Sequence, residues 1–337
     1  PTTSISATTA TIEGNLTSFG GGTQPTIVLR YDDDSTYQVP RSVSSFPFGL
    51  GPKLALWLDA NDSSSISQID GNVSQWSDKS GNNLNMVQET NASKPKTALN
   101  SHNGLNLISF DGDDYLNRPY TNILNRNLTC FIVARVDTGG IDNVQDAVIS
   151  YGNVGNGKWE LRAANTGSFN SKLAKNSSWI STVNFTSALD TLHLFTIDFD
   201  INSSTSSMWV NGSVVNASTP DSLGLAEKQR ITLMGNRANS PQTIGGKMAE
   251  LIFLRSVDPT ERKKMEGYLA HRWGINASLP SDHPHRFIRP KGMVPLTSVS
   301  LGSKPLGAFS HTLTGLSPGT QYHFRFQSSN PNGMAYS

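Results

Sequence analysis

Short segments in which apolar and polar residues alternate follow one another along most of the chain, and clusters of Gly, Asn, Ser and Pro separate them. In residues 54–58, for example, Leu54, Leu56 and Leu58 share one face and Trp57 lies on the other. A period of two residues is typical of a β-strand, because successive side chains of a strand point to opposite sides of the sheet. Many such strands joined by turns predict an all-β chain built from two-layer sandwiches.

The composition agrees with many short strands and excludes several classes of function. Charged residues make up 16% of the chain, against about 25% in an average soluble domain, and Ser, Thr, Asn and Gly supply the polarity instead. The formal net charge is +1 and the sequence has no basic cluster, so nucleic acid is not an expected partner. No run approaches the ~20 apolar residues of a membrane helix, and we expect no membrane span.

One segment has the period of a helix instead of a strand. Asp258 is a suitable N-cap, Pro259 suits the first helical position, and Glu261 completes a capping box. Met265, Leu269 and Trp273 fall at i, i+4 and i+8 and form one apolar stripe. We therefore predict one short amphipathic helix over 258–273, packed against a sheet edge.

The two ends of the chain are interpreted as two parts of one small domain. Strands are predicted at 9–16 and 25–31 near one end, and at 308–314 and 323–326 near the other. Neither end supplies the roughly seven strands of a stable sandwich. We predict that residues 1–45 and 290–337 are the halves of one domain, with residues 50–289 inserted between them. The alternative, two unrelated flanking fragments, would leave open sheet edges.

The C-terminal part resembles a fibronectin type III domain. Leu316, Pro318, Thr320 and Tyr322 match the Leu-x-Pro-x-Thr-x-Tyr run that forms the tyrosine corner of that family. The resemblance implies an immunoglobulin- or fibronectin-like sandwich for the split domain. It implies nothing about an activity.

Residues 50–289 resemble the laminin-G-like branch of the concanavalin A-like lectin and glucanase superfamily. The resemblance is carried by the Trp-Leu-Asp-Ala run at 57–60, the Trp-x-Asp-x-Ser-Gly-Asn run at 76–82, the Phe-Asp-Gly-x-Asp-Tyr-Leu run at 110–116 and the strand 248–253 before the helix. It implies a large two-sheet jelly roll. Members of this superfamily include sugar binders, adhesion modules and accessory domains of enzymes, so the fold leaves the function open.

The acidic residues argue against catalysis. Sugar-cleaving relatives carry carboxylates on one strand as Glu-x-Asp-x-x-Glu, and glycoside hydrolysis requires such a pair. No such run occurs, and Glu160 and Glu250 are each isolated within a predicted strand. We therefore assign no catalytic residue and predict that the chain is not an enzyme.

Two binding sites remain as candidates. Asp111, Asp113 and Asp114 lie on one short loop, which suits calcium because hard cations prefer several carboxylate oxygens; the alternative is a hairpin with solvated acids. Trp159 and Trp179 lie near loop-rich stretches and are the candidates for stacking on sugar rings, although most tryptophans of a sandwich pack in its core.

The leading functional prediction is a secreted or cell-surface structural or adhesive module, a repeat or subunit of a large surface protein or filament. Its partners would be copies of itself or neighbouring domains. The alternative is a lectin domain that binds glycans, with calcium as the candidate cofactor. Asn-x-Ser/Thr patterns fit a secreted glycoprotein. The candidate acceptors are Asn15, Asn61, Asn72, Asn91, Asn127, Asn176, Asn184, Asn202, Asn211, Asn216 and Asn276.

Overall fold

The computed structural model describes most of the chain. The described residues are 2–5, 9–18, 24–32, 46–102, 104–121, 127–141, 146–153, 157–164, 167–175, 178–200, 205–220, 229–235, 243–290, 297–314, 323–330 and 333–336. The chain divides into two compact units, one made of Pro1–Pro40 with Lys291–Ser337 and the other of Arg41–Pro290. We call them the terminal unit and the central unit.

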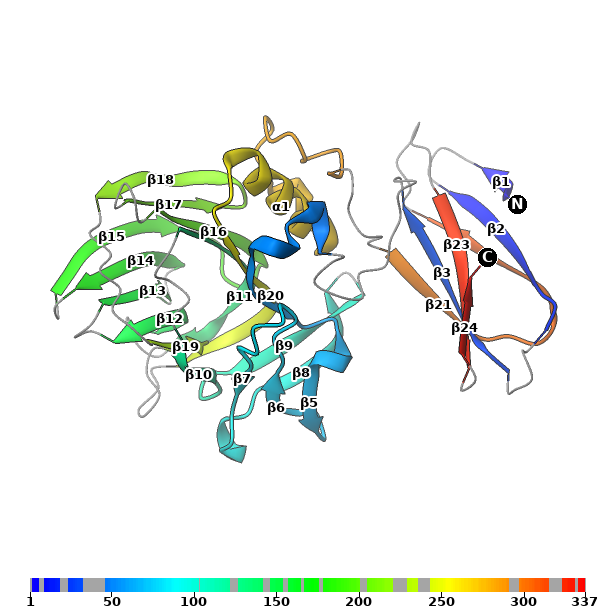
Figure 1. Ribbon diagram of the computed structural model, residues 1–337, viewed down its shortest axis with the longest axis horizontal. Coiled ribbons are helices and arrows are strands. Elements are labelled where there is room, and N and C mark those ends of the chain that lie inside the picture. Colours follow the sequence, from blue (N-terminus) through cyan, green and yellow to red (C-terminus); the bar gives the residue numbers. More distant parts are fainter. Residues whose placement is uncertain are drawn as a thin grey trace. The chain divides into compact units, whose positions relative to one another are not determined.

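The terminal unit combines strands from both ends of the chain in two antiparallel sheets (Figure 1). One sheet has the order β1 (Thr2–Ile5), β2 (Ala10–Leu16), β22 (Gly307–Leu313), and the other has the order β21 (Thr297–Ser303), β3 (Thr26–Asp32), β23 (His323–Asn330), β24 (Gly333–Tyr336). Its core is small, and the buried residues among those described there are centred on Ile12, Leu29 and Leu313.

The central unit is a large β-sandwich with one α-helix among its described residues. Its strands are β4 (Leu54–Asp59), β5 (Ile66–Ile69), β6 (Asn72–Trp76), β7 (Met86–Val87), β8 (Lys96–His102), β9 (Leu105–Asp111), β10 (Leu116–Thr121), β11 (Leu128–Ile141), β12 (Ala147–Asn153), β13 (Gly157–Ala163), β14 (Ser168–Lys175), β15 (Ser178–Thr186), β16 (His193–Asp200), β17 (Thr205–Val210), β18 (Ser213–Pro220), β19 (Gln229–Leu233) and β20 (Ile244–Arg255).

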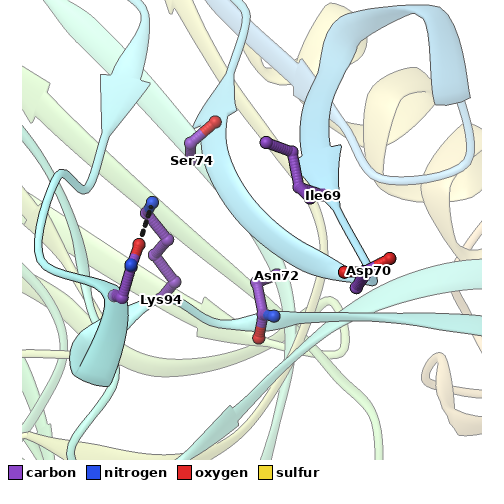
Figure 2. A pocket seen from close by; sticks show the side chains of 6 residues that line it. Ile69, Asp70, Asn72, Ser74 and Lys94 are labelled. Carbon is purple, nitrogen blue, oxygen red and sulfur yellow. Dashed lines mark hydrogen bonds between the residues drawn. The ribbon is translucent and has the colours of Figure 1, made fainter.

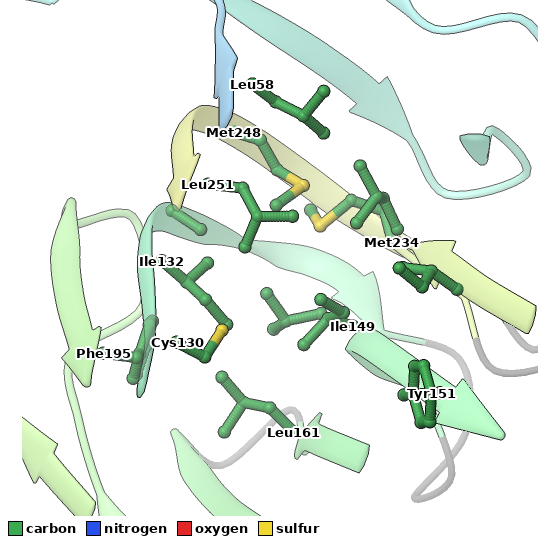
Figure 3. Close-up of a cluster of buried hydrophobic side chains, with 14 of the residues drawn as sticks. Leu58, Cys130, Ile132, Ile149, Tyr151, Leu161, Phe195, Met234, Met248 and Leu251 are labelled. Atoms are coloured by element: carbon green, nitrogen blue, oxygen red, sulfur yellow. The ribbon is translucent and has the colours of Figure 1, made fainter. Parts of the chain in front are cut away.

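Antiparallel pairings arrange these strands in two sets. One set runs β18-β17-β16-β11-β20, and β20 continues to both β4 and β9, with β8 beyond β9. The other runs β15-β14-β13-β12-β19-β10-β7-β6-β5. The two sets enclose one apolar core, to which Leu58, Ile132, Leu161 and Leu251 contribute (Figure 3). The predicted all-β fold with a large sandwich is confirmed.

The helix α1 (Pro259–Arg272) begins as the sequence predicts. The Asp258 carboxylate accepts hydrogen bonds from the backbone N–H groups of Thr260 and Glu261, and the Glu261 side chain accepts one from the backbone N–H of Asp258. This reciprocal capping box satisfies donors that the first helical turn leaves open. The predicted packing at a sheet edge is wrong: α1 contacts β11 and β16, which are both paired on two sides.

The stripe of Met265, Leu269 and Trp273 is fully buried against the face of the sandwich. An apolar stripe gains more free energy against a sheet face than at its edge, because the face removes more of the stripe from water. Among the described residues no helix is long and apolar enough to cross a membrane.

Candidate functional site

An open pocket with a volume of about 380 Å³ lies beside the hairpin of β5 and β6 (Figure 2). Its lining consists of Ile69, Asp70, Asn72, Ser74, Asn91 and Lys94. Five of these six residues carry hydrogen-bonding side chains, and the sixth, Ile69, is 78% exposed. We call this feature the hairpin pocket. The residues of this pocket come from two separate segments that match no motif, so the sequence alone does not predict it.

The hairpin turn positions one side of the pocket. Asp70 and Gly71 both have positive φ, 52° and 81°, as a two-residue type I′ turn requires. The backbone N–H of Gly71 donates to the Gln68 side-chain oxygen at 2.6 Å, which further fixes the turn. Asn72 and Ser74 are two residues apart on β6 and therefore share a face, while Val73 between them is buried in the core.

The short 3-10 turn Asn91–Ser93 and the following Lys94 form the other side of the pocket. The backbone N–H of Val73 donates to the carbonyl oxygen of Pro95 at 2.7 Å, which ties this segment to β6. The Lys94 ammonium donates to the Asn91 side-chain oxygen at 2.6 Å, and Figure 2 shows this bond. The pocket therefore presents a cation, amides, a hydroxyl and a carboxylate together with one exposed apolar side chain.

The structure brings the three predicted calcium ligands together. One carboxylate oxygen from each of Asp111, Asp113 and Asp114 lies within 4.8 Å of the others. Asp114 is buried, and its carboxylate accepts a hydrogen bond of 3.1 Å from the backbone N–H of Asp111. Burial and the neighbouring Asp111 raise the pKa of Asp114 to about 7. Calcium binding at these residues stays a prediction.

The raised pKa of Asp114 predicts a pH-dependent stability. An unfolded Asp has a pKa of about 3.9, so between about pH 4 and pH 7 the folded chain holds a proton that the unfolded chain releases. The stability contribution of protonated Asp114 is therefore present below pH 4 and is lost as the pH rises to 7. In Asp114→Asn, which stays neutral, thermal unfolding measured from pH 4 to pH 8 should show a smaller fall over this range than in the unmodified chain.

Asp190 supplies a control, because its pKa is shifted in the opposite direction from that of Asp114. Hydrogen bonds from the hydroxyl and backbone N–H of Thr138, at 2.6 and 3.0 Å, lower the pKa of Asp190. Its contribution is present above the unfolded pKa and is lost as the pH falls through the folded value. Asp190→Asn should therefore differ from the unmodified chain at neutral pH and approach it in acid. Parallel curves for Asp114→Asn and the unmodified chain would contradict the assignment for Asp114.

Trp159, one of the two predicted sugar-stacking residues, is a core residue. It is 0% exposed, its indole N–H donates to the Ser171 hydroxyl at 3.0 Å, and its ring meets Phe199 edge-on at 5.3 Å. The alternation of β13 directs Trp159 inward together with Leu161. Because a sugar can stack only on an exposed ring face, the prediction for Trp159 is wrong. Trp179 lies on β15, and its side chain is outside the described residues.

The glycosylation candidates fall into several environments. Asn15, Asn91 and Asn184 are exposed, whereas Asn61, Asn72 and Asn127 are half-buried. Asn211 and Asn276 use their amide nitrogens inside the fold, at 3.0 Å from His193 Nδ1 and from the Arg286 carbonyl oxygen. The side chain of Asn216 and the whole of Asn176 and Asn202 lie outside the described residues, as do Leu316, Pro318, Thr320 and Tyr322.

A buried charge cluster joins α1 to β4 and β20, and the sequence analysis missed it. Arg272 donates to both carboxylate oxygens of Asp59 at 2.8 Å, and its Nε lies 3.4 Å from Glu250. Glu250 is 0% exposed. It was predicted to be isolated within its strand, and that prediction is wrong. Its carboxylate accepts two indole N–H bonds, from Trp57 and Trp273, both at 2.8 Å. Burial raises the pKa of Glu250, and Arg272 opposes that shift.

No family model and no curated protein matches the sequence. Solved structures do match. Trypanosoma rangeli sialidase in complex with sialic acid has a TM-score of 0.47 and 14% identity over 65% of this chain and 33% of the sialidase chain. The Ruminococcus gnavus IT-sialidase CBM40 bound to alpha2,6 sialyllactose has a TM-score of 0.34 and 14% identity over 41% of this chain and 80% of that chain. A point mutant of HCR/D has a TM-score of 0.49 and 15% identity over 66% of this chain and 54% of the HCR/D chain.

These matches correct one prediction. We predicted that the chain is not an enzyme, and this is contradicted by similar chains that are sialidases. The missing Glu-x-Asp-x-x-Glu run excludes one arrangement of carboxylates and not glycosidases in general. This chain spans about a third of the length of the sialidase chains.

Proposed function

We propose that the central unit binds carbohydrate and that the hairpin pocket is its binding site. The observation that carries the proposal is the lining of the pocket: five hydrogen-bonding side chains together with the exposed Ile69, on a β-sandwich surface. A sugar presents hydroxyl groups that both donate and accept, together with apolar C–H faces. Amide, carboxylate and hydroxyl side chains complement those hydroxyl groups, and an exposed aliphatic side chain complements a C–H face.

The rigidity of the pocket supports binding with little loss of conformational entropy. The I′ turn, the Gly71–Gln68 hydrogen bond and the backbone bond from Val73 to Pro95 hold both sides of the pocket in place without a ligand. A site that is already formed spends less of its interaction free energy on ordering side chains and loops.

We further propose that the central unit is a concanavalin A-like jelly roll related to laminin-G domains, and that the terminal unit is a fibronectin-like sandwich interrupted by it. Strand pairing between the two ends of the chain supports the second assignment, since β2 pairs with β22 and β3 with both β21 and β23. A secreted or cell-surface location and an adhesive role in which copies of the chain associate stay predictions. Glycan binding and adhesion are compatible roles.

Asn72→Ala and Ser74→Ala test the proposed site. Each removes one hydrogen-bonding side chain from β6, and a glycan identified on an array should bind each variant about 3- to 10-fold more weakly in calorimetric titration. Asn184→Ala, an exposed asparagine on β15, is the matched control and should bind like the unmodified chain. Unchanged affinity in both pocket variants would place the site elsewhere, and an array without any bound glycan would refute the function.

A further inference from the structure

We propose that the hairpin pocket selects an acidic sugar, one that carries a carboxylate or a sulfate, and that Lys94 binds its negative charge. This inference rests on the proposed glycan-binding function and specifies the ligand class of the same site. Three observations support it: the Lys94 ammonium has no ion pair among the described residues, Asp70 lies on the other side of the pocket, and neutral polar groups lie between them.

The charge of Lys94 is not balanced by any described acid. Its ammonium donates to the neutral Asn91 side-chain oxygen at 2.6 Å, and no ion pair of Lys94 occurs within the part of the chain that the structure describes. An ammonium has three N–H donors, so two remain for a ligand. The Asn91 bond also restrains the long side chain, which lowers the entropy that binding would cost.

The Lys94 ammonium should interact more strongly with an anion than with a neutral group. A hydrogen bond between two charged groups is about twice as strong as one between neutral groups. The Lys94 residue is half-buried, but the bond from its ammonium to Asn91 is exposed to solvent. Water screens such an exposed pair, so the gain is modest and is largest at low salt. An acidic sugar would therefore gain more from this pocket than a neutral sugar of the same shape.

The position of Asp70 determines the orientation expected for a bound acidic sugar. It lies at the hairpin turn, and Figure 2 shows it on the side of the pocket away from Lys94, with Asn72 and Ser74 between them. A carboxylate accepts hydrogen bonds from sugar hydroxyls and repels an anion. The acidic group of the sugar is thus directed to Lys94 and a hydroxyl group to Asp70.

The test compares matched ligands that differ in charge alone. One pair is an oligosaccharide of uronic acid residues and its carboxyl-reduced, neutral counterpart; the other is a sulfated oligosaccharide and its desulfated form. Calorimetry at low salt should give about 2- to 5-fold tighter binding to the acidic member of one pair. The pair that responds distinguishes a carboxylate from a sulfate ligand. Raising the salt concentration should narrow the difference.

Variants of the two charged residues complete the test. Lys94→Gln should weaken binding of the acidic ligand about 2- to 5-fold and leave binding of the neutral counterpart unchanged, while Lys94→Arg should retain the preference for the acidic ligand. Asp70→Asn should bind the acidic ligand as tightly as the unmodified chain or a few-fold more tightly. Melting temperatures close to that of the unmodified chain verify that the variants are folded.

The outcomes separate the two proposals. Equal binding of acidic and neutral ligands, or an equal loss for both in Lys94→Gln, would overturn the acidic-sugar inference and leave glycan binding intact. Binding of neither ligand pair, together with an empty glycan array, would overturn both.

Discussion

Replacing Arg272 with Leu is expected to lower the free energy of unfolding of the central unit by about 3–5 kcal/mol. Arg272 bridges Asp59 on β4 and Glu250 on β20 from the end of α1. Without the guanidinium, two carboxylates remain in a site from which water is excluded. Glu250 keeps its two indole donors and Asp59 keeps Lys79 at 3.0 Å, but Glu250 loses its cation and Asp59 loses one of its two.

Tryptophan fluorescence during urea unfolding measures this effect directly, because all six tryptophans of the chain lie in Arg41–Pro290. The matched control is Arg135→Leu. Arg135 pairs with Asp137 at 2.5 Å, but both side chains are 30% exposed, so its loss should cost less than about 1 kcal/mol. Equal destabilisation by the two substitutions would show that the buried cluster contributes no more than a surface ion pair.

Gly246→Ala is expected to cost about 3 kcal/mol or more, or to prevent folding of the central unit. A Cβ atom at this position would lie 2.2 Å from the carbonyl oxygen of Arg135. Gly246 pairs with Val136 of β11 on one side and with Phe110 of β9 on the other, so it lies within the central part of its sheet. Relief of the clash would have to separate two hydrogen-bonded strands, since the obstructing atom belongs to the backbone.

Gly235→Ala is the control for this prediction. The nearest atoms to a Cβ at Gly235 are side-chain carbons at 3.4 Å or more, which is an ordinary contact. Soluble yield and urea unfolding of the two variants should therefore differ clearly, with Gly235→Ala close to the unmodified chain. Similar stability of the two variants would mean that β11 and β20 separate easily at this point. The close approach of Gly246 to the Arg135 carbonyl oxygen would then not restrict the side chain at position 246.

Local sequence patterns predicted the parts of the fold that depend on neighbouring residues. The capping box of α1 needs only Asp258 and Glu261, three residues apart, and it forms as expected. The alternation of Leu54, Leu56 and Leu58 was likewise sufficient to predict β4. In both cases the decisive interactions lie within one turn of helix or along one strand.

Features that depend on distant residues were not predictable in this way. Asp59, Glu250 and Arg272 meet only because β4 pairs with β20 and the Arg272 side chain reaches both carboxylates from the end of α1, so each appears as an isolated charge in the sequence. The hairpin pocket similarly combines a turn at Asp70 with a second turn at Asn91. The inward direction of Trp159 depends on its strand register, which loop-rich flanking sequence does not reveal.

The buried position of the single cysteine allows the opening of the central unit to be measured by chemical labelling. Cys130 is 0% exposed on β11, between β16 and β20, and burial raises the pKa of its thiol well above the usual value. A thiol reagent reacts with the thiolate and needs access to sulfur. Labelling of Cys130 therefore requires the separation of inner strands, and its rate reports the large-scale opening of the sandwich without an introduced probe.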